Sequence, residues 1–352
     1  MTLRQRLSYG AKLTLSHALY YMGLLQLWQR VVMRRKAVVL MYHRVLTAEQ
    51  RARSASHPAI IVDPDTFAQH MRLLKRRFVP LTADEFVERM EQNRPFPDSA
   101  CLITFDDGWH DNLTNALPVL ERHGLPALVF LPVNYIGRER LFWQEALVHL
   151  LTRMLAVLRT QPERKARFAE LLAPHGLASA LEIADTNPRG ALIQAIGAQK
   201  RLDRRVIESL RVSLAAELQV HEEELTSVDG FIDWDEARAM QTRGITFGGH
   251  GAEHLLLTQV SAGEAEAEIR TSRAVLAERL GDSDRITFSY PNGYWTPEVA
   301  ARVQAEGYRV GFVTRRGFVD CSDDKFTVCR LNIHEGVTST APMFLARVVG
   351  LL

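Results

Sequence analysis

The chain has 352 residues, more than an average domain, although barrels of alternating strands and helices use about 250 residues or more as one unit. Hydrophobic residues make up 47% and charged residues 24%, the ordinary balance of a globular protein with a sizeable core. The net charge of +2 gives no reason to expect nucleic-acid binding. Cys101, Cys321 and Cys329 lack paired C-x-x-C spacing, which argues against a zinc–thiolate site and an extensive disulfide framework.

Residues 1–35 are predicted to form an amphipathic helical segment. Residues 13–33 are rich in Leu, Tyr, Met and Trp, but polar side chains interrupt them, so they fall short of a span of about 18 apolar residues. Because Arg34, Arg35 and Lys36 follow, the segment either lies on a membrane surface or packs on the domain itself. The start shows no conventional signal peptide, so we expect a cytoplasmic protein or one peripheral to the inner face of the cytoplasmic membrane.

The remainder, residues 36–352, is predicted to form one α/β domain. Its first part predicts a strand at 36–42 (KAVVLMY), a polar loop at 47–57, helices at 65–78 and 83–92, and a buried strand at 100–105 (ACLITF). A helix at 112–123 and a strand at 127–133 then complete a β-α-β unit, which requires parallel pairing.

A helical insertion is expected at about residues 138–229. This stretch has helical periodicity without a strand signal, and about ninety residues far exceed a usual crossover between strands. The alternation then resumes, with helices predicted at 233–243, 262–280 and 296–306 and strands at 245–248, 286–290, 310–314 and 328–333.

Polar residues with chemical potential follow several of these strands. They are Asp106 and Asp107, His250 and His254, residues 291–293, and His334. In parallel architectures the loops after the strands gather at one face, where sites are built.

The histidine and aspartate pairs together suggest a metal site. His250 and His254 have i, i+4 spacing, which lets both imidazoles converge on one cation. Alone, such a pair is more often a coincidence, and Asp-Asp-Gly after a strand is a common turn. Two imidazoles and one carboxylate, however, match a catalytic zinc site, and the second aspartate is suited to accept a proton.

Three motifs resemble those of the polysaccharide deacetylases with the NodB homology domain, carbohydrate esterase family 4. Residues 103–112, ITFDDGWHDN, are similar to the first motif, TFDDG followed by D-N. Residues 250–254, HGAEH, resemble the second, and 288–293, FSYPNG, resemble the third in its Y-P-x-G form. The resemblance covers residues 36 to about 334, apart from the insertion.

This resemblance implies a distorted (β/α) barrel with fewer than eight strands, a NodB-like fold, carrying the helical insertion. It assigns Asp107, His250 and His254 to a divalent metal, expected to be zinc, with cobalt, nickel, manganese and iron as alternatives. Asp106 becomes the general base. The implied activity is metal-dependent removal of N-acetyl groups from N-acetylhexosamine residues of a polysaccharide or a lipid-linked glycan.

The sequence departs from the family pattern at several positions. Gly251 stands where Ser or Thr is usual, and Ser289 where an arginine that orients the base is expected. Arg330 is a candidate replacement for that arginine, with a surface ion pair as the alternative. The Asp-Trp motif that supports the general acid is not evident at 310–320, so His334 either protonates the leaving amine or has no chemical role.

The substrate contacts are predicted beside the motifs. His43, in MYHR, resembles the opening Y-H-R motif of one branch of the family and is expected to border the sugar. Trp109, Tyr290 and Pro291 are predicted to contact the substrate, with ordinary packing as the alternative. Two other functions stay open: a carbohydrate-binding or scaffold protein on a degenerate barrel, and a deformylase or amidase acting on a related amide.

Overall fold

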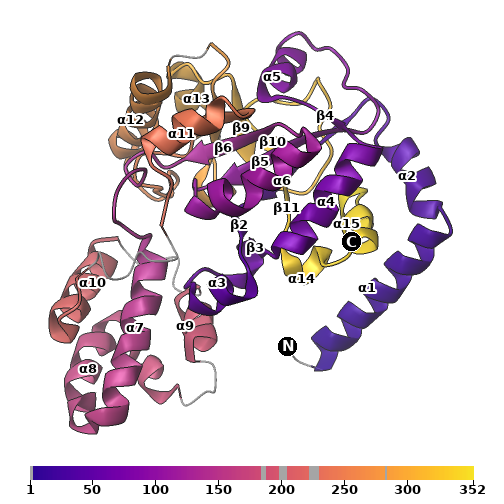
Figure 1. Ribbon diagram of the computed structural model, residues 1–352. Coiled ribbons are helices and arrows are strands. Elements are labelled where there is room, and N and C mark those ends of the chain that lie inside the picture. The colour runs from indigo at the N-terminus through magenta and orange to yellow at the C-terminus, as the bar shows by residue number, and fades with distance from the viewer. Residues whose placement is uncertain (1–2, 184–187, 198–203, 222–229, 282–283) are drawn as a thin grey trace. The chain divides into compact units, whose positions relative to one another are not determined.

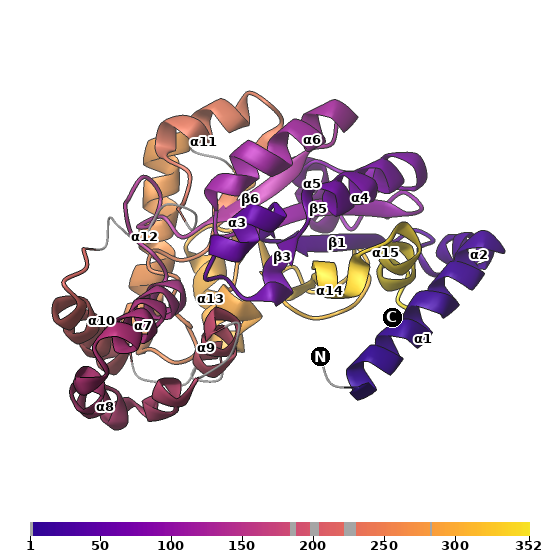
Figure 2. The same cartoon turned by 60° about the horizontal axis from the view of Figure 1, so that its bottom comes forward.

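Figures 1 and 2 show the computed structural model, which describes residues 3–183, 188–197, 204–221, 230–281 and 284–352. The chain divides into two compact units, each described below by itself. The first unit comprises Met1–Leu46, Pro58–Gly137 and Phe231–Leu352, and the second comprises Thr47–His57 and Arg138–Gly230.

A parallel sheet forms the centre of the first unit. Its strands follow the spatial order β10-β9-β8-β7-β6-β5-β1-β11. They are β1 (Ala37–Tyr42), β5 (Ala100–Asp106), β6 (Ala127–Leu131), β7 (Ile245–Gly249), β8 (Thr287–Ser289), β9 (Val310–Val313), β10 (Val328–Cys329) and β11 (Leu331–Asn332), and β4 (Val79–Pro80) also pairs with β5. Every residue of β1, β5 and β6 is buried, which explains why these strands are continuous apolar runs rather than alternating ones.

The two ends of the sheet are formed by one short stretch of chain. β10 pairs with β9 and β11 pairs with β1, yet only Arg330 separates β10 from β11. The strand predicted at 328–333 is therefore interrupted at Arg330 and contacts both edges of the sheet. Counted as one interrupted strand, it leaves seven strands in the path, with β4 as an additional strand beside β5, and the arrangement is the predicted distorted barrel.

Helices of the first unit surround this sheet (Figures 1 and 2). They are α1 (Leu3–Tyr21), α2 (Leu24–Val32), α4 (Pro64–Arg77), α5 (Ala83–Glu91), α6 (Leu117–His123), α11 (Trp234–Gln241), α12 (Ala262–Leu280), α13 (Pro297–Ala305), α14 (Glu335–Thr338) and α15 (Ala341–Val348). Thr82, Asp233 and Ser261 begin α5, α11 and α12 with complete capping boxes, which satisfy backbone N–H groups of the first turn. Among the described residues, no helix is both long and apolar enough to span a membrane.

The second unit is helical. Its helices are α3 (Ala48–Arg53), α7 (Trp143–Thr160), α8 (Lys165–Leu172), α9 (Pro188–Gly197) and α10 (Arg204–Leu218). α7 lies at its centre and contributes Leu147, Leu151 and Met154 to a separate apolar cluster with Phe168 and Leu214. The prediction of a polar loop at 47–57 was wrong, because Thr47 and Gln50 form a capping box that starts α3.

Candidate metal and catalytic site

The site lies at the carboxyl ends of neighbouring parallel strands. Asp106 is the last residue of β5, and His250 directly follows β7. β6 lies between these strands and pairs with both, so the two loops open at the same edge of the sheet. Asp107 and His254 both have left-handed backbone, with φ of 76° and 54°, a conformation that is uncommon for residues other than glycine and clusters at functional sites.

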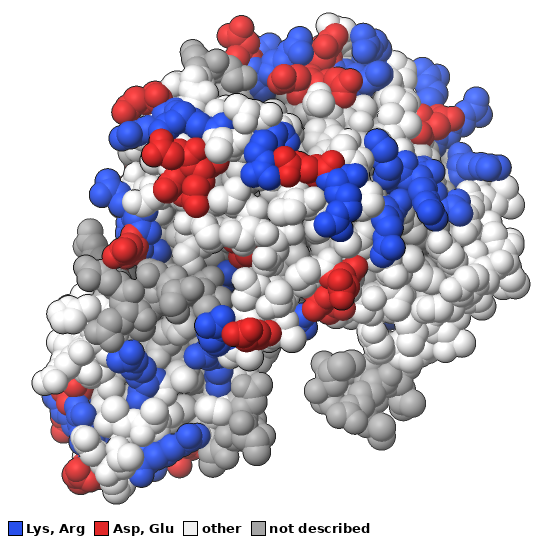
Figure 3. All heavy atoms as spheres, viewed as in Figure 1, with Lys and Arg blue, Asp and Glu red and all other residues white. Residues whose placement is uncertain are grey.

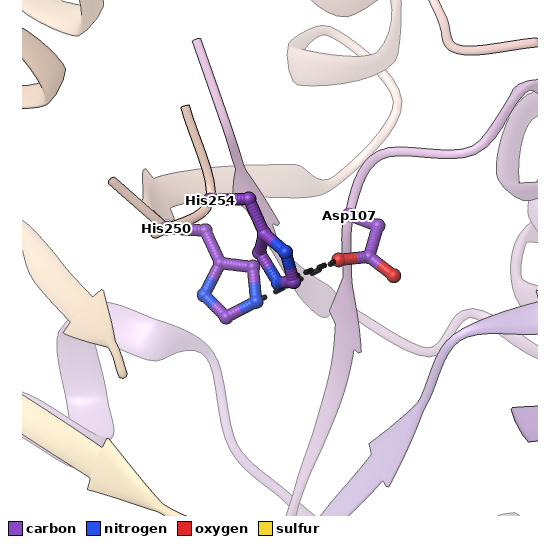
Figure 4. A group of neighbouring side chains, drawn as sticks. All are labelled: Asp107, His250 and His254. Atoms are coloured by element: carbon purple, nitrogen blue, oxygen red, sulfur yellow. Dashed lines mark ion pairs between the residues drawn. The ribbon is translucent and has the colours of Figure 1, made fainter. Parts of the chain in front are cut away.

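The side chains of Asp107, His250 and His254 converge (Figure 4). Oδ1 of Asp107 lies 3.6 Å from Nε2 of His250 and 3.5 Å from Nε2 of His254. In a tetrahedral zinc site with bonds of about 2.0–2.1 Å, neighbouring ligand atoms are about 3.3 Å apart. The three side chains therefore have the spacing and the donor types that a catalytic divalent metal requires.

Neighbouring groups fix the orientation of two of these side chains. Nδ1 of His250 donates to the carbonyl oxygen of Ser289 at 2.7 Å, which leaves Nε2 facing the other two side chains. Burial lowers the pKa of His250, although Asp106 opposes the shift, so the ring is neutral at neutral pH, the form that binds metals. Trp109 Nε1 donates to Oδ2 of Asp107 at 2.9 Å, so Oδ1 faces the histidines.

Asp106 forms a buried ion pair beside this group. Arg330 donates to Oδ1 at 2.6 Å and to Oδ2 at 2.8 Å, and it also donates to Oγ of Ser289 at 2.7 Å. Because Arg330 is only 1% exposed, the surface ion pair considered for it is excluded, and the guanidinium orients Asp106. Burial raises the pKa of Asp106, but the charges of Arg330 and His250 lower it more, so that pKa falls well below its ordinary value.

The segment that carries His43 is fixed by the end of the first motif. Arg44 is fully buried and pairs with Asp111 at 2.8 Å, while Asn112 donates to the carbonyl oxygen of His43 at 2.7 Å. Nε2 of His43 lies 3.9 Å from Oδ2 of Asp106. The D-N pair of the motif thus has a structural task, positioning His43 beside Asp106, which the sequence did not indicate.

The loop between the two histidines is held by Glu268 of α12, a residue that the sequence reasoning missed. Its buried carboxylate accepts from the backbone N–H groups of Ala252 and Glu253 at 2.9–3.2 Å. Gly251 has φ 79°, and a Cβ there would lie 2.9 Å from Oε2 of Glu268. The carboxylate therefore occupies the space beside Gly251. Glu268 could have been found as the one charged residue in the buried stripe of its helix, which also contains Ala265, Ile269, Ser272 and Leu276.

His334 lies at the same edge of the sheet. β11 pairs with β1 so that Asn332 faces Met41, and extending this register two residues further places His334 level with His43. β1 pairs with β5 so that Tyr42 faces Phe105, which brings His43 level with Asp106 in turn. His334 is half-buried and begins α14. Its role as general acid stays a prediction.

Three of the predicted substrate contacts are corrected by the structure. Trp109 is fully buried, stacks on Phe231 at 4.6 Å between ring centroids, and supports Asp107 instead. Tyr290 is also fully buried and donates to a backbone carbonyl, and Pro291 is buried beside it. Side chains without exposed surface offer no face to a sugar, so among these four predictions only His43, which is partly exposed, stays a candidate.

The sequence profile of the family described as polysaccharide deacetylase matches residues 93–158 and 205–311. The chain belongs to this family. Both matched ranges contribute to the site, Asp106 and Asp107 from the first and His250 and His254 from the second. His43, Arg330 and His334 lie outside them, so the family profile carries no information about the orienting arginine or the candidate acid.

One known protein resembles the chain in sequence, and two solved structures resemble it in fold. The Bacillus subtilis (strain 168) protein YxkH, which bears the name polysaccharide deacetylase, is 29% identical over 119 residues, 34% of this chain and 39% of that protein. The Streptococcus pyogenes deacetylase PplD, solved in complex with acetate, has a TM-score of 0.56 at 17% identity and covers 89% of this chain and 98% of its own. IcaB from Ammonifex degensii has a TM-score of 0.56 at 18% identity, covering 90% and 97%. These likenesses confirm the predicted barrel.

Proposed function

We propose that this protein is a metal-dependent hydrolase that removes N-acetyl groups from N-acetylhexosamine residues of a polysaccharide or a lipid-linked glycan. The observation that carries the proposal is the placement of Asp106, held by two hydrogen bonds from buried Arg330, beside the group of Asp107, His250 and His254. A protein that only bound carbohydrate would need neither an oriented carboxylate nor three metal-ligand side chains.

Asp107, His250 and His254 would hold the cation, with zinc as the expected ion. Such a cation supplies Lewis acidity toward the acetamide carbonyl and lowers the pKa of water at its open positions. Two imidazoles and one carboxylate are the donor set found in catalytic zinc sites that leave positions for water and substrate.

Asp106 acts as the general base. Its low pKa keeps it ionised through neutral pH, and Arg330 and Ser289 hold the carboxylate in one orientation. A carboxylate of such low pKa is a poor base toward free water, so its function depends on a water whose own pKa is lowered. This dependence supports pairing Asp106 with the neighbouring metal group rather than treating it as an independent catalyst.

The leaving amine requires a proton, and His334 is the proposed donor. An imidazole has a pKa suited to proton transfer near neutral pH, and His334 lies in the row of strand ends that also carries His43 and Asp106. His43, 3.9 Å from Asp106, is the second candidate.

The decisive experiment measures acetate and formate released from N-acetylated and N-formylated glycans by metal-free protein reloaded with zinc, cobalt, nickel, manganese or iron. Asp107→Ala, His250→Ala and His254→Ala are expected to lose both metal and activity, whereas Asp106→Asn should retain metal and lose turnover. Asp235→Asn, which alters a mostly exposed aspartate on α11, is the matched control and should resemble the wild type.

The outcomes separate the alternatives. Full metal content in the Ala variants would contradict the metal assignment, and high turnover in Asp106→Asn would place the base elsewhere. Formate release without acetate release would replace the deacetylase by a deformylase. Saturable glycan binding without hydrolysis under every metal condition would favour a binding protein.

A further inference from the structure

The outward face of α2 is apolar. Leu24, Leu27, Trp28 and Val31 follow i, i+3, i+4, i+7 spacing and are each 43–63% exposed. Leu25 and Gln29, on the other side of the helix, are buried. A surface helix of a globular protein normally turns its apolar stripe toward the core, so α2 shows the reverse arrangement.

This exposed stripe continues onto α1. Leu15, Tyr21 and Met22 are 55–78% exposed, and the two helices meet at Gly23, whose φ of 76° allows the sharp turn between them. In the described part of the chain twelve large hydrophobic residues are exposed, and seven of them lie within residues 15–31. We call these seven residues the apolar ridge. Contiguous apolar surface of this kind marks an interaction site.

The ridge is the free face of a firmly attached hairpin of helices. Gln29 donates from its amide to the carbonyl oxygen of Arg77 at 3.0 Å and to Oγ of Ser99 at 3.1 Å. Trp28 Nε1 donates to the carbonyl oxygen of Val349 at 3.1 Å. The hydroxyl groups of Tyr9 and Ser339 form a hydrogen bond of 2.7 Å. The segment therefore packs on the rest of the first unit through its other side and through the indole N–H of Trp28, and the remaining surface of the ridge is exposed.

Positive charge surrounds the ridge. The sequence contains no Asp or Glu before Glu49, while residues 1–36 contain seven Lys or Arg. Exposed cations also lie on α2, in the turn after it and at the end of α4, where the carbonyl oxygen of Arg77 contacts Gln29. They are Arg30, Arg34, Arg35, Arg76 and Arg77. We call them the basic collar. Asp98 lies at the edge of this collar and accepts from the backbone N–H of Arg35.

Figure 3 shows the two features together, with a concentration of blue spheres adjoining a broad white area on the side of the molecule that carries α1 and α2. Apolar side chains flanked by Lys and Arg match a membrane interface with anionic headgroups, where the apolar groups enter the headgroup boundary and the cations meet the phosphates. Pairing of two ridges from two copies would instead bring two basic collars together, and their like charges would oppose association.

We infer that the apolar ridge and the basic collar dock this protein on the surface of an anionic phospholipid membrane. The inference is independent of the deacetylase proposal, because it uses none of the site residues. It reconciles the two readings of the N-terminal segment, since one face packs on the domain and the other meets lipid.

Cosedimentation of the full chain with vesicles tests the inference. The wild type should bind vesicles of equal parts phosphatidylglycerol and phosphatidylcholine at least about 10-fold more tightly than pure phosphatidylcholine vesicles, and high salt should weaken the difference. Leu27→Ser combined with Val31→Ser should weaken binding about 10-fold or more, and Arg30→Gln combined with Arg76→Gln about 10-fold. Val212→Ser, which alters an equally exposed valine on α10, is the matched control and should bind as the wild type does.

Circular dichroism and thermal unfolding identify any variant that fails to fold. Intrinsic fluorescence gives a second readout: Trp28 is one of five tryptophans and lies on the ridge, so the total emission should shift to the blue on binding lipid, and this shift should be lost in a Trp28→Phe variant. Equal affinity for the two vesicle types, or equal loss in the Val212→Ser control, would overturn the inference. So would a stable dimer in light scattering that dissociates only in the Leu27→Ser, Val31→Ser variant, because the ridge would then bind a second copy.

Discussion

Replacing Arg330 with Met removes the buried positive charge that orients Asp106. The substitution keeps an unbranched apolar stem but removes both hydrogen bonds to Asp106, leaving a carboxylate that is 3% exposed without its cation. Removing one partner of a buried ion pair destabilises a protein by about 3–5 kcal/mol. Because total stability is typically about 5–15 kcal/mol, the change should be plain in urea unfolding.

A double-mutant cycle distinguishes the ion pair from general packing. Asp106→Asn alone leaves Arg330 buried without its carboxylate and should also destabilise, whereas the combination with Arg330→Met should recover about 2 kcal/mol or more relative to the sum of the single changes. Arg270→Met, which breaks the exposed pair with Glu306, is the control and should change stability little. Additive single effects, or Arg330→Met stability within about 1 kcal/mol of the wild type, would refute the reasoning.

Three further predictions concern other parts of the first unit. His334→Ala should lower kcat roughly 10²- to 10⁴-fold with metal content unchanged and should flatten the basic limb of the pH profile, and a near-normal kcat would transfer the role to His43. Glu268→Gln should weaken metal affinity about 10-fold or more, because an amide oxygen is a weaker acceptor than a carboxylate for the N–H groups of the histidine loop. An unchanged affinity, measured by competition with a chelator, would show that Glu268 has only a structural role. Burial lowers the pKa of His70 to about 3, so between pH 6.5 and 5 this histidine becomes protonated in the unfolded chain but stays neutral in the folded protein. The free energy of unfolding should therefore fall by about 2 kcal/mol over this range relative to that of the His70→Gln variant. Parallel curves of stability against pH for the two proteins would contradict this.

The sequence predicted the parts of the site whose geometry is local. Asp107 directly follows one strand, and the i, i+4 pair of His250 and His254 follows another, so parallel pairing was enough to expect their convergence. The alternation of strands and helices predicted the fold class in the same way. Each of these inferences needed only the strand ends and the spacing of a few residues.

The rest depended on contacts between distant parts of the chain. Arg330 lies at the interruption between two strand segments that pair with opposite edges of the sheet. Glu268 contacts the histidine loop from a helix that packs against it. Trp109 and Tyr290 were mispredicted because adjacency to a motif does not say whether a side chain faces the solvent or the core. These contacts and exposures are set by the packing of residues that lie far apart in the sequence, so the local pattern does not reveal them.

The interrupted last strand also orders the assembly of the active centre during synthesis. The candidate metal ligands have all been made once residue 254 leaves the ribosome, whereas the guanidinium that orients Asp106 arrives only with residue 330. The same residue separates the two strand segments that join the sheet's edges. A growing chain therefore receives the guanidinium that orients Asp106 from the same short segment that joins the two edges of its sheet.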